Sequence, residues 1–138
     1  MKKDFLLLLK SSGLKITPAR LEILNVFSLD CHPIDAEYIG KHLKNKKINQ
    51  VTIYRNLASL EKEGIIRRVN LQQEAVNYEL ADHHHHHFIC TVCGQTESFA
   101  GCDISSLITS VLKKSTKFKK INYHSLELFG LCKKCAQG

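Results

Sequence analysis

INQVTIYRNLASLEKEG, residues 48–64, decides the fold of the N-terminal half of the chain. Asn49 is a strong helix N-cap residue and Gly64 is a common helix stop, so we expect one helix between them. Its apolar residues recur at i, i+4 and i+7 and predict one buried face, formed by Ile53, Leu57 and Leu60. The following residues, 65–80, alternate around a polar turn and predict two strands.

Two further helices are expected before this one. Residues 16–29 begin with the N-cap Thr17 followed by proline, and residues 32–43 carry Asp35 as a cap. A short apolar helix over residues 4–11 comes before both. Three helices followed by a hairpin are a winged helix-turn-helix arrangement, which belongs to the α+β class.

The polar faces of residues 48–64 carry side chains suited to DNA. The recognition helix of a helix-turn-helix domain enters the major groove with its N-terminal half leading. Arginine pairs with guanine or phosphate, glutamine with adenine, and aromatic or methyl groups contact thymine. The candidate DNA-contacting residues here are Gln50, Thr52, Tyr54 and Arg55. Alternatively, Tyr54 belongs to the core and Arg55 is a solvated surface charge.

The composition indicates a basic protein with an anionic partner. The chain of 138 residues has 20 Lys and Arg against 13 Asp and Glu, a formal net charge of +7. Such an excess favours nucleic acid, although a merely basic soluble protein has the same charge. No apolar run approaches the roughly 18 residues of a membrane span, and FLLLL, residues 5–9, is too short for a signal peptide. We therefore expect a cytoplasmic protein with no membrane partner.

Four of the six cysteines form two Cys-x-x-Cys pairs, Cys90/Cys93 and Cys132/Cys135. In a reducing compartment such pairs bind metal more often than they form disulfides. Two residues between thiolates let one tight turn direct both sulfurs at one ion, and two such turns complete a tetrahedral zinc site. The ion would close the 38 residues between the pairs into a small domain. A redox-active pair is the alternative, but no thioredoxin-like βαβ unit is evident.

Five consecutive histidines, residues 83–87, lie inside the chain directly before Phe88 and Ile89. A purification tag normally lies at a terminus behind a flexible spacer, so this position disfavours a tag. The apolar flank predicts a strand, in which successive side chains face opposite ways. One face would carry His83, His85 and His87, and the other would carry His84 and His86. One strand can thus serve two metal sites, and neutral imidazole suits zinc, iron, nickel or copper.

Five stretches, in this order, resemble the bacterial ferric uptake regulator family of repressors. They are GLKITPAR (13–20), VTIYRNLASLEKEGII (51–66), NYEL (77–80), HHHHHFICTVCG (83–94) and HSLELFGLCKKC (124–135). The resemblance implies a homodimer whose subunits join an N-terminal winged-helix DNA-binding domain, residues 1–80, to a C-terminal metal-binding α/β dimerisation domain, residues 81–138. Family members bind palindromic, A/T-rich double-stranded operator DNA when a divalent metal is bound.

The resemblance also implies the role of each candidate ligand. The regulatory metal site would be formed by His32, Glu79, His85 and His87. The auxiliary site would be formed by His84, His86 and His124. The cysteines would hold structural Zn²⁺, and the regulatory ion would be Fe²⁺, with Zn²⁺ or Mn²⁺ as alternatives. Lys15 resembles the family's minor-groove lysine, and Tyr54 and Arg55 resemble its major-groove readers.

Two positions depart from the family pattern. The carboxylate that many members carry in the segment ESFAG is Ser98 here, which leaves the regulatory site four-coordinate. The usual auxiliary glutamate is Ser105, so Asp103 or Cys102 would have to complete that site. Glu79 stands where peroxide-sensing members carry aspartate, which disfavours peroxide sensing. A zinc-uptake regulator stays an alternative.

The positions of these ligands along the chain predict a regulatory mechanism. His32 and Glu79 belong to the first predicted domain, whereas His85 and His87 belong to the second. One ion joining them would clamp the hinge between the domains and fix the separation of two recognition helices in a dimer. Cys31, beside His32, is expected to be a small buried thiol, with a thiolate ligand as the alternative.

Other classes of protein are disfavoured. A metal-dependent hydrolase requires an open coordination position and a nearby general base, and no zinc-protease or deaminase signature is present. A metal-storage protein could use the histidine run but would not require a winged helix. We therefore expect neither an enzyme nor a small-molecule substrate.

Overall fold

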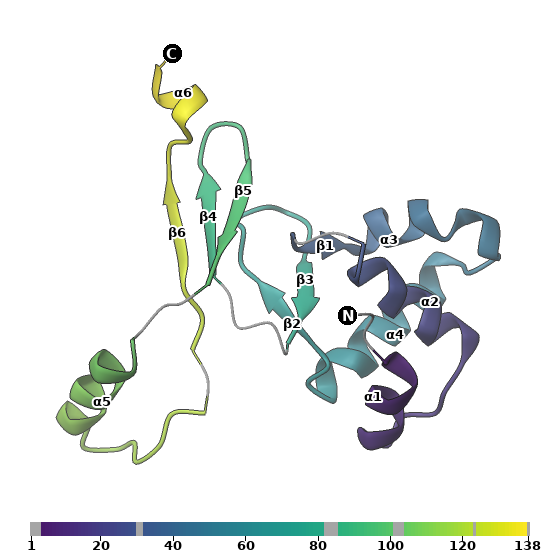
Figure 1. The fold of residues 1–138 in the computed structure, drawn as a ribbon, viewed down its shortest axis with the longest axis horizontal. Coiled ribbons are helices and arrows are strands. Elements are labelled where there is room, and N and C mark those ends of the chain that lie inside the picture. Colours follow the sequence, from purple (N-terminus) through teal and green to yellow (C-terminus); the bar gives the residue numbers. More distant parts are fainter. Residues whose placement is uncertain (1–3, 30–31, 82–85, 101–103, 123, 138) are drawn as a thin grey trace. The chain divides into compact units, whose positions relative to one another are not determined.

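The chain folds into two compact units, Met1–His83 and His84–Gly138, each with helices and a sheet (Figure 1). The computed structural model describes residues 4–29, 32–81, 86–100, 104–122 and 124–137. The α+β class is as expected. Several candidate residues lie outside the described residues, namely Cys31, His83, His84, His85, Cys102 and Asp103.

The helices of the N-terminal unit begin where the sequence predicts. They are α1 Phe5–Ser11, α2 Pro18–Phe27, α3 Ala36–His42 and α4 Gln50–Lys62. Each follows a cap whose side chain accepts a hydrogen bond from a first-turn N–H, namely Asp4, Thr17, Asp35 and Asn49. Gly64, with φ 72°, follows α4 as the predicted stop. Among the described residues, no helix is both long and apolar enough to span a membrane.

Two features of this unit escaped prediction. A single turn of 3₁₀ helix, η1 Lys44–Lys46, connects α3 to α4. A short strand, β1 Ile34–Asp35, pairs with the outer side of the predicted hairpin. The hairpin itself is confirmed as β2 Ile66–Val69 and β3 Asn77–Leu80, and the sheet order is β1-β3-β2. Two residues are too few to show an alternating pattern, so β1 had no signal in the sequence.

The core of the N-terminal unit joins its helices to the hairpin. Ile53, Leu57 and Leu60 are at most 1% exposed, which confirms the predicted buried face of α4. Ile66 and Leu80 bring the sheet into the same cluster. Full burial of such side chains contributes about 1.5–3 kcal/mol each, so this unit has an ordinary hydrophobic core of its own.

The C-terminal unit is a mixed sheet with strand order β5-β4-β6. Its elements are β4 His86–Cys90, β5 Thr96–Phe99, α5 Ser105–Lys114, β6 Glu127–Gly130 and α6 Lys133–Gln137. β4 is antiparallel to β5 and parallel to β6. The strand predicted around Phe88 and Ile89 is therefore confirmed.

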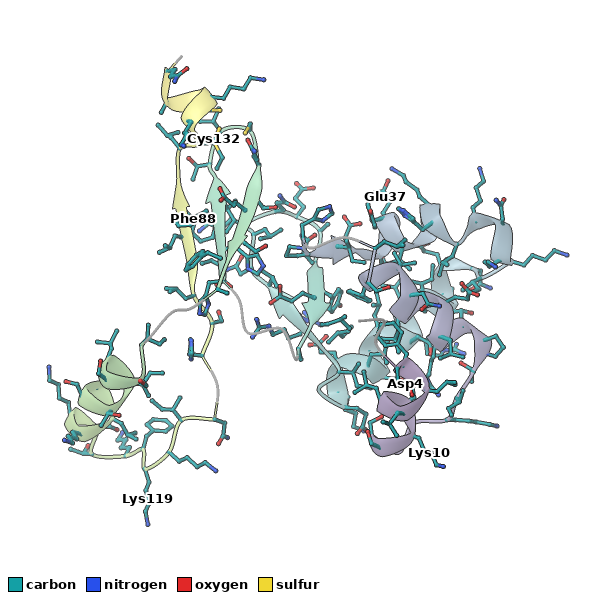
Figure 2. The ribbon with its side chains drawn as sticks, viewed as in Figure 1. Asp4, Lys10, Glu37, Phe88, Lys119 and Cys132 are labelled. Atoms are coloured by element: carbon teal, nitrogen blue, oxygen red, sulfur yellow. The ribbon has the colours of Figure 1, made fainter. Side chains whose placement is uncertain are left out.

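The C-terminal unit buries few apolar side chains. Among its described residues, the buried hydrophobic ones are Ile89 and Cys90, and α5 has none. Its exposed large apolar side chains, with Phe88 labelled on β4 in Figure 2, are Phe88, Val92, Leu107, Val111, Phe118, Ile121, Leu128, Phe129 and Leu131. So small a core supplies too little hydrophobic free energy to hold a unit of this size. Its stability must have another source.

Asn49→Ala should lower the free energy of unfolding of the N-terminal unit by about 1 kcal/mol. The Asn49 Oδ1 accepts the Thr52 N–H at 2.8 Å, and alanine leaves that donor without its cap. Urea denaturation of the full chain, followed by circular dichroism, measures the change. Asn45→Ala, an exposed asparagine in η1, is the matched control and should cost less than about 0.5 kcal/mol. Equal losses in both variants would show that the cap contributes nothing of its own.

Candidate metal centre

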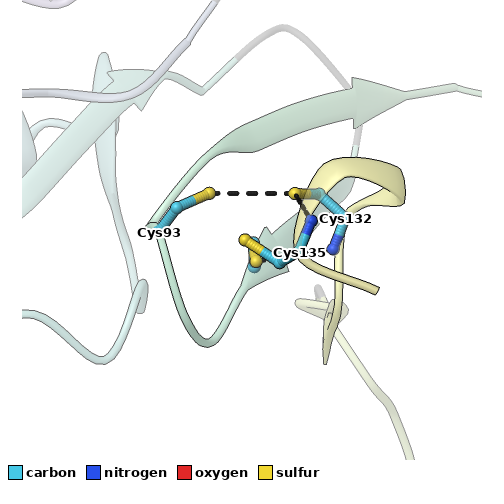
Figure 3. A group of neighbouring side chains, drawn as sticks. Cys93, Cys132 and Cys135 are labelled. Atoms are coloured by element: carbon cyan, nitrogen blue, oxygen red, sulfur yellow. Dashed lines mark hydrogen bonds between the residues drawn. The ribbon is translucent and has the colours of Figure 1, made fainter. Parts of the chain in front are cut away.

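Four sulfur atoms meet at one end of the C-terminal sheet. Cys90 ends β4, Cys93 lies in the turn after it, Cys132 directly precedes α6, and Cys135 lies within α6. All four sulfurs lie within 4.8 Å of one another, and the Cys93 and Cys132 sulfurs are 3.8 Å apart (Figure 3). Zn–S bonds of about 2.3 Å place neighbouring sulfurs of a tetrahedral site about 3.8 Å apart. The cluster therefore fits a structural zinc ion.

Backbone hydrogen bonds shape the first cysteine turn. The Gly94 N–H donates to the Cys90 carbonyl at 3.0 Å and closes the Cys-x-x-Cys turn. Gly94 has φ 77°, a left-handed conformation that glycine adopts without steric cost. The Thr91 N–H donates to the Gly130 carbonyl at 2.8 Å and joins the end of β4 to the end of β6. The two cysteine pairs, distant in sequence, are thereby held side by side.

Two thiols of the cluster have pKa values shifted in opposite directions. Backbone N–H groups of Cys93, Cys132 and Val92 lower the pKa of Cys90 from 9.0 to about 6, so that this sulfur is a thiolate at neutral pH. A side-chain hydrogen bond with Cys132, followed by burial, raises the pKa of Cys135 to about 12. Metal binding requires thiolates. An incoming ion could therefore bind the Cys90 thiolate directly but would have to displace the proton of the Cys135 thiol.

The histidines of β4 lie on opposite faces of the sheet because they are consecutive. The ring centroid of His86 is 5.3 Å from that of His124 and 5.5 Å from that of Phe99. The structure thus brings together two of the three predicted auxiliary ligands, and His84 lies outside the described residues. His86 is buried, so a metal there would be well shielded from water.

His87 lies at the centre of the other face. It is 1% exposed, and its register partners are Ser98 on β5 and Glu127 on β6. The predicted departure at Ser98 therefore lies directly beside a predicted regulatory ligand. Glu127 was not predicted, because only the pairing of β4 with a distant strand brings this residue beside His87. The predicted partner His85 lies outside the described residues.

The two predicted regulatory ligands of the N-terminal unit lie at the same end of its sheet. β1 pairs antiparallel with β3 through Ile34 and Tyr78, so the chain before Ile34 runs toward Glu79. His32 is exposed, with Nδ1 3.1 Å from the Pro33 carbonyl oxygen. Glu79 is 5% exposed, an unusual degree of burial for a carboxylate.

α4 presents a second candidate site, on the face opposite the core. Tyr54 is 59% exposed and Arg55 is exposed, so the alternative that Tyr54 belongs to the core is wrong. Thr52 is half-buried. Val51, 62% exposed beside them, escaped the sequence analysis because a valine is by default a core residue. Lys15 is exposed in the loop before α2.

Gln50 has a partner that its sequence position did not indicate. Its Nε2 donates to the Ala36 carbonyl at 3.1 Å and ties the start of α4 to α3. Gly40 makes room for it, because a Cβ there would lie 2.6 Å from the Gln50 Oε1. This hydrogen bond therefore joins the starts of the two helices, and the predicted base contact of Gln50 stays a prediction.

The ferric uptake regulator family model matches residues 11–129. The chain belongs to this family. It is 38% identical over 128 residues to the ferric uptake regulation protein of Yersinia pestis, covering 90% of this chain and 85% of that protein. As a family member it is a metal-responsive regulator and not an enzyme.

Solved ferric uptake regulators have the same fold. The Vibrio cholerae protein is 33% identical, with a TM-score of 0.75 over 94% of this chain and 100% of that one. The Helicobacter pylori protein, described with three functional metal-binding sites, is 30% identical, with a TM-score of 0.76 over 97% of this chain and 90% of that one. The matched residues include most of both units.

Cys93→Ser should abolish tight zinc binding, because three sulfurs no longer close a tetrahedral site. After dialysis against EDTA, elemental analysis should find about one zinc ion per wild-type chain and none in the variant. The thermal midpoint of the variant should fall as well. Val92→Ala, 70% exposed between Cys90 and Cys93, is the matched control and should keep the ion. A Cys93→Ser protein with its zinc and thermal midpoint intact would show that Cys93 is not a ligand of this ion.

Proposed function

We propose that this protein is a cytoplasmic transcriptional repressor that binds palindromic, A/T-rich operator DNA as a homodimer when a divalent metal is bound. Iron(II) is the first candidate for the sensed ion. The observation that carries the proposal is the exposed face of α4, where Tyr54 and Arg55 lie opposite a fully buried apolar face. Exposed aromatic and guanidinium groups at the start of such a helix suit a major groove.

The charge of the chain supports DNA as the partner. A net charge of +7 attracts a polyanion, and each phosphate contact releases counterions. Lys15, exposed before α2, is proposed to enter the narrow minor groove of A/T-rich DNA, where negative potential is concentrated. Thr52 and Gln50 are proposed to assist at the helix start, Gln50 mainly by holding α4 against α3.

The sparse core of the C-terminal unit supports a homodimer. α5 has a row of exposed apolar residues, and β4 and β6 expose Phe88, Leu128 and Phe129. A second copy of the same unit would cover these surfaces and provide the burial that one chain lacks. Two copies would also present two α4 helices to a palindrome.

The donor set suggests how metal controls DNA binding. His32 and Glu79 belong to the N-terminal unit, and His85 and His87 are proposed to complete the regulatory site from the other unit. One ion joining both units would fix the spacing of the recognition helices in the dimer. A coupling of about 1–3 kcal/mol would change operator affinity about 5–150-fold.

The identity of the ion rests on donor chemistry and on relatives. Three imidazoles and one carboxylate suit iron(II), manganese(II) and zinc(II), so the donors alone do not decide among these metals. The Yersinia pestis relative is named for ferric uptake, which favours iron. His84, His86 and His124 are proposed to form an auxiliary site that lacks the family's usual glutamate and contributes less.

Metal-dependent operator binding tests the whole proposal. Fluorescence anisotropy with a palindromic A/T-rich duplex should show tighter binding as iron(II) is added without oxygen, with manganese(II) and zinc(II) in parallel. His87→Ala should remove this response, His86→Ala should weaken it mildly, and His42→Ala, an exposed histidine on α3, should leave it intact. A full response in His87→Ala would contradict the regulatory site, and binding that no metal changes would contradict the function.

Tyr54→Ala should lower operator affinity about 5–150-fold, the loss of one base contact of about 1–3 kcal/mol, and leave binding to unrelated DNA nearly unchanged. Lys62→Ala, at the far end of α4, is the control and should alter both affinities little. Competition with operator and scrambled duplexes at one salt concentration measures both. Equal losses on both duplexes would mean that Tyr54 contacts only the DNA backbone or supports the fold.

A further inference from the structure

Arg67 holds the carboxylate that the proposed function assigns to the regulatory metal. The Arg67 Nε donates to the Glu79 Oε1 at 2.7 Å, and Nη2 lies 2.6 Å from the same oxygen. The Glu79 side chain is 6% exposed and that of Arg67 is 24% exposed. Charge-assisted hydrogen bonds of this length in a buried position are strong.

The pairing follows from the register of the wing, which is the β2–β3 hairpin. Arg67 on β2 and Glu79 on β3 are direct register partners, so both side chains leave the sheet on one face. The neighbouring Arg68 projects from the other face, where it pairs with Glu61 at 2.9 Å. That second pair is much more exposed, with 60% of the Arg68 and 32% of the Glu61 side chain accessible. One strand thus carries one buried and one exposed Arg–Glu pair.

The buried pair places a positive charge where a cation is expected. A carboxylate buried without a counter-charge is costly, so Arg67 stabilises the metal-free wing. A divalent ion bound by Glu79 would share the carboxylate with the guanidinium and would be repelled by it at short range. Metal and Arg67 therefore compete for one negative charge.

We propose that Arg67 is the internal competitor of the regulatory metal, and that it sets the free metal concentration at which the protein responds. In the metal-free protein Arg67 neutralises Glu79 and keeps the hairpin folded. Metal binding weakens or displaces this ion pair. The free energy lost with the pair lowers the net affinity of the site for the ion. The inference rests on the proposed function, because it takes Glu79 as a metal ligand.

Arg67→Gln should therefore tighten metal binding about tenfold, because it removes the short-range repulsion between the guanidinium and the ion. Manganese(II) is the probe, followed by its electron paramagnetic resonance signal in full-length protein with its structural zinc loaded. Arg68→Gln removes the same charge from the same strand, so it is the matched control and should change the affinity less than about twofold. Arg67→Lys keeps the charge without the planar fork and should lie between wild type and Arg67→Gln.

Thermal unfolding gives a second readout. Without manganese(II), Arg67→Gln should unfold at a lower temperature than Arg68→Gln, because only the former strands a buried carboxylate. Added manganese(II) should raise the midpoint of Arg67→Gln more than that of wild type. If Arg67→Gln unfolds without metal, its refolding by manganese(II) supports the proposal, and Arg67→Lys then supplies the affinity comparison.

Two outcomes would overturn the inference. Weaker manganese(II) binding in Arg67→Gln would show that Arg67 orients Glu79 for the metal, and unchanged binding would show that the pair is only structural. Glu79→Gln separates these from failure of the proposed function. If Glu79→Gln binds manganese(II) as wild type does, Glu79 is not a ligand and the regulatory site itself is wrong. If Glu79→Gln loses binding while Arg67→Gln equals wild type, only the role of Arg67 fails.

Discussion

The convergence of four cysteine sulfurs is the constraint on which the C-terminal unit depends. Two turns with 38 residues between them must lie side by side before Cys90, Cys93, Cys132 and Cys135 can share one ion. Joining them closes a long loop. The entropy cost of loop closure rises only slowly with loop length, and the binding free energy of a structural zinc ion is larger than this cost. The parallel pairing of β4 with β6, which places Glu127 beside His87, brings the two turns to the same end of the sheet.

The two units are stabilised in different ways. The N-terminal unit has capped helices around a continuous aliphatic core, so it can present Tyr54 and Val51 to solvent without losing its fold. The C-terminal unit leaves its apolar residues exposed and relies on metal, and by our proposal on a second copy. By our proposal the surface that contacts DNA belongs to the unit with the continuous core, and the regulatory ion takes ligands from both units.

Arg67 and Glu79 form an ion pair at the end of the β2–β3 hairpin. A buried ion pair contributes little net stability compared with apolar packing, but removing one partner is costly. By our proposal such a pair also responds to metal, since a cation of higher charge can compete for the carboxylate. Glu127, beside His87 in the other unit, adds a second carboxylate near the predicted ligands. The charge around both predicted ligands thus depends on residues that the sequence motifs do not mark as ligands.

The sequence by itself determined whatever depends on neighbouring residues. Asn49 and Gly64 predicted the ends of α4, and the spacing of Ile53, Leu57 and Leu60 predicted its buried face. The two Cys-x-x-Cys pairs predicted the cysteine cluster. Only the tertiary structure decided that Gln50 binds the backbone of α3, that Arg67 faces Glu79, and that Ser98 and Glu127 flank His87. These contacts depend on which strands and helices become neighbours, and that is set by packing and register across the chain, which local spacing does not encode.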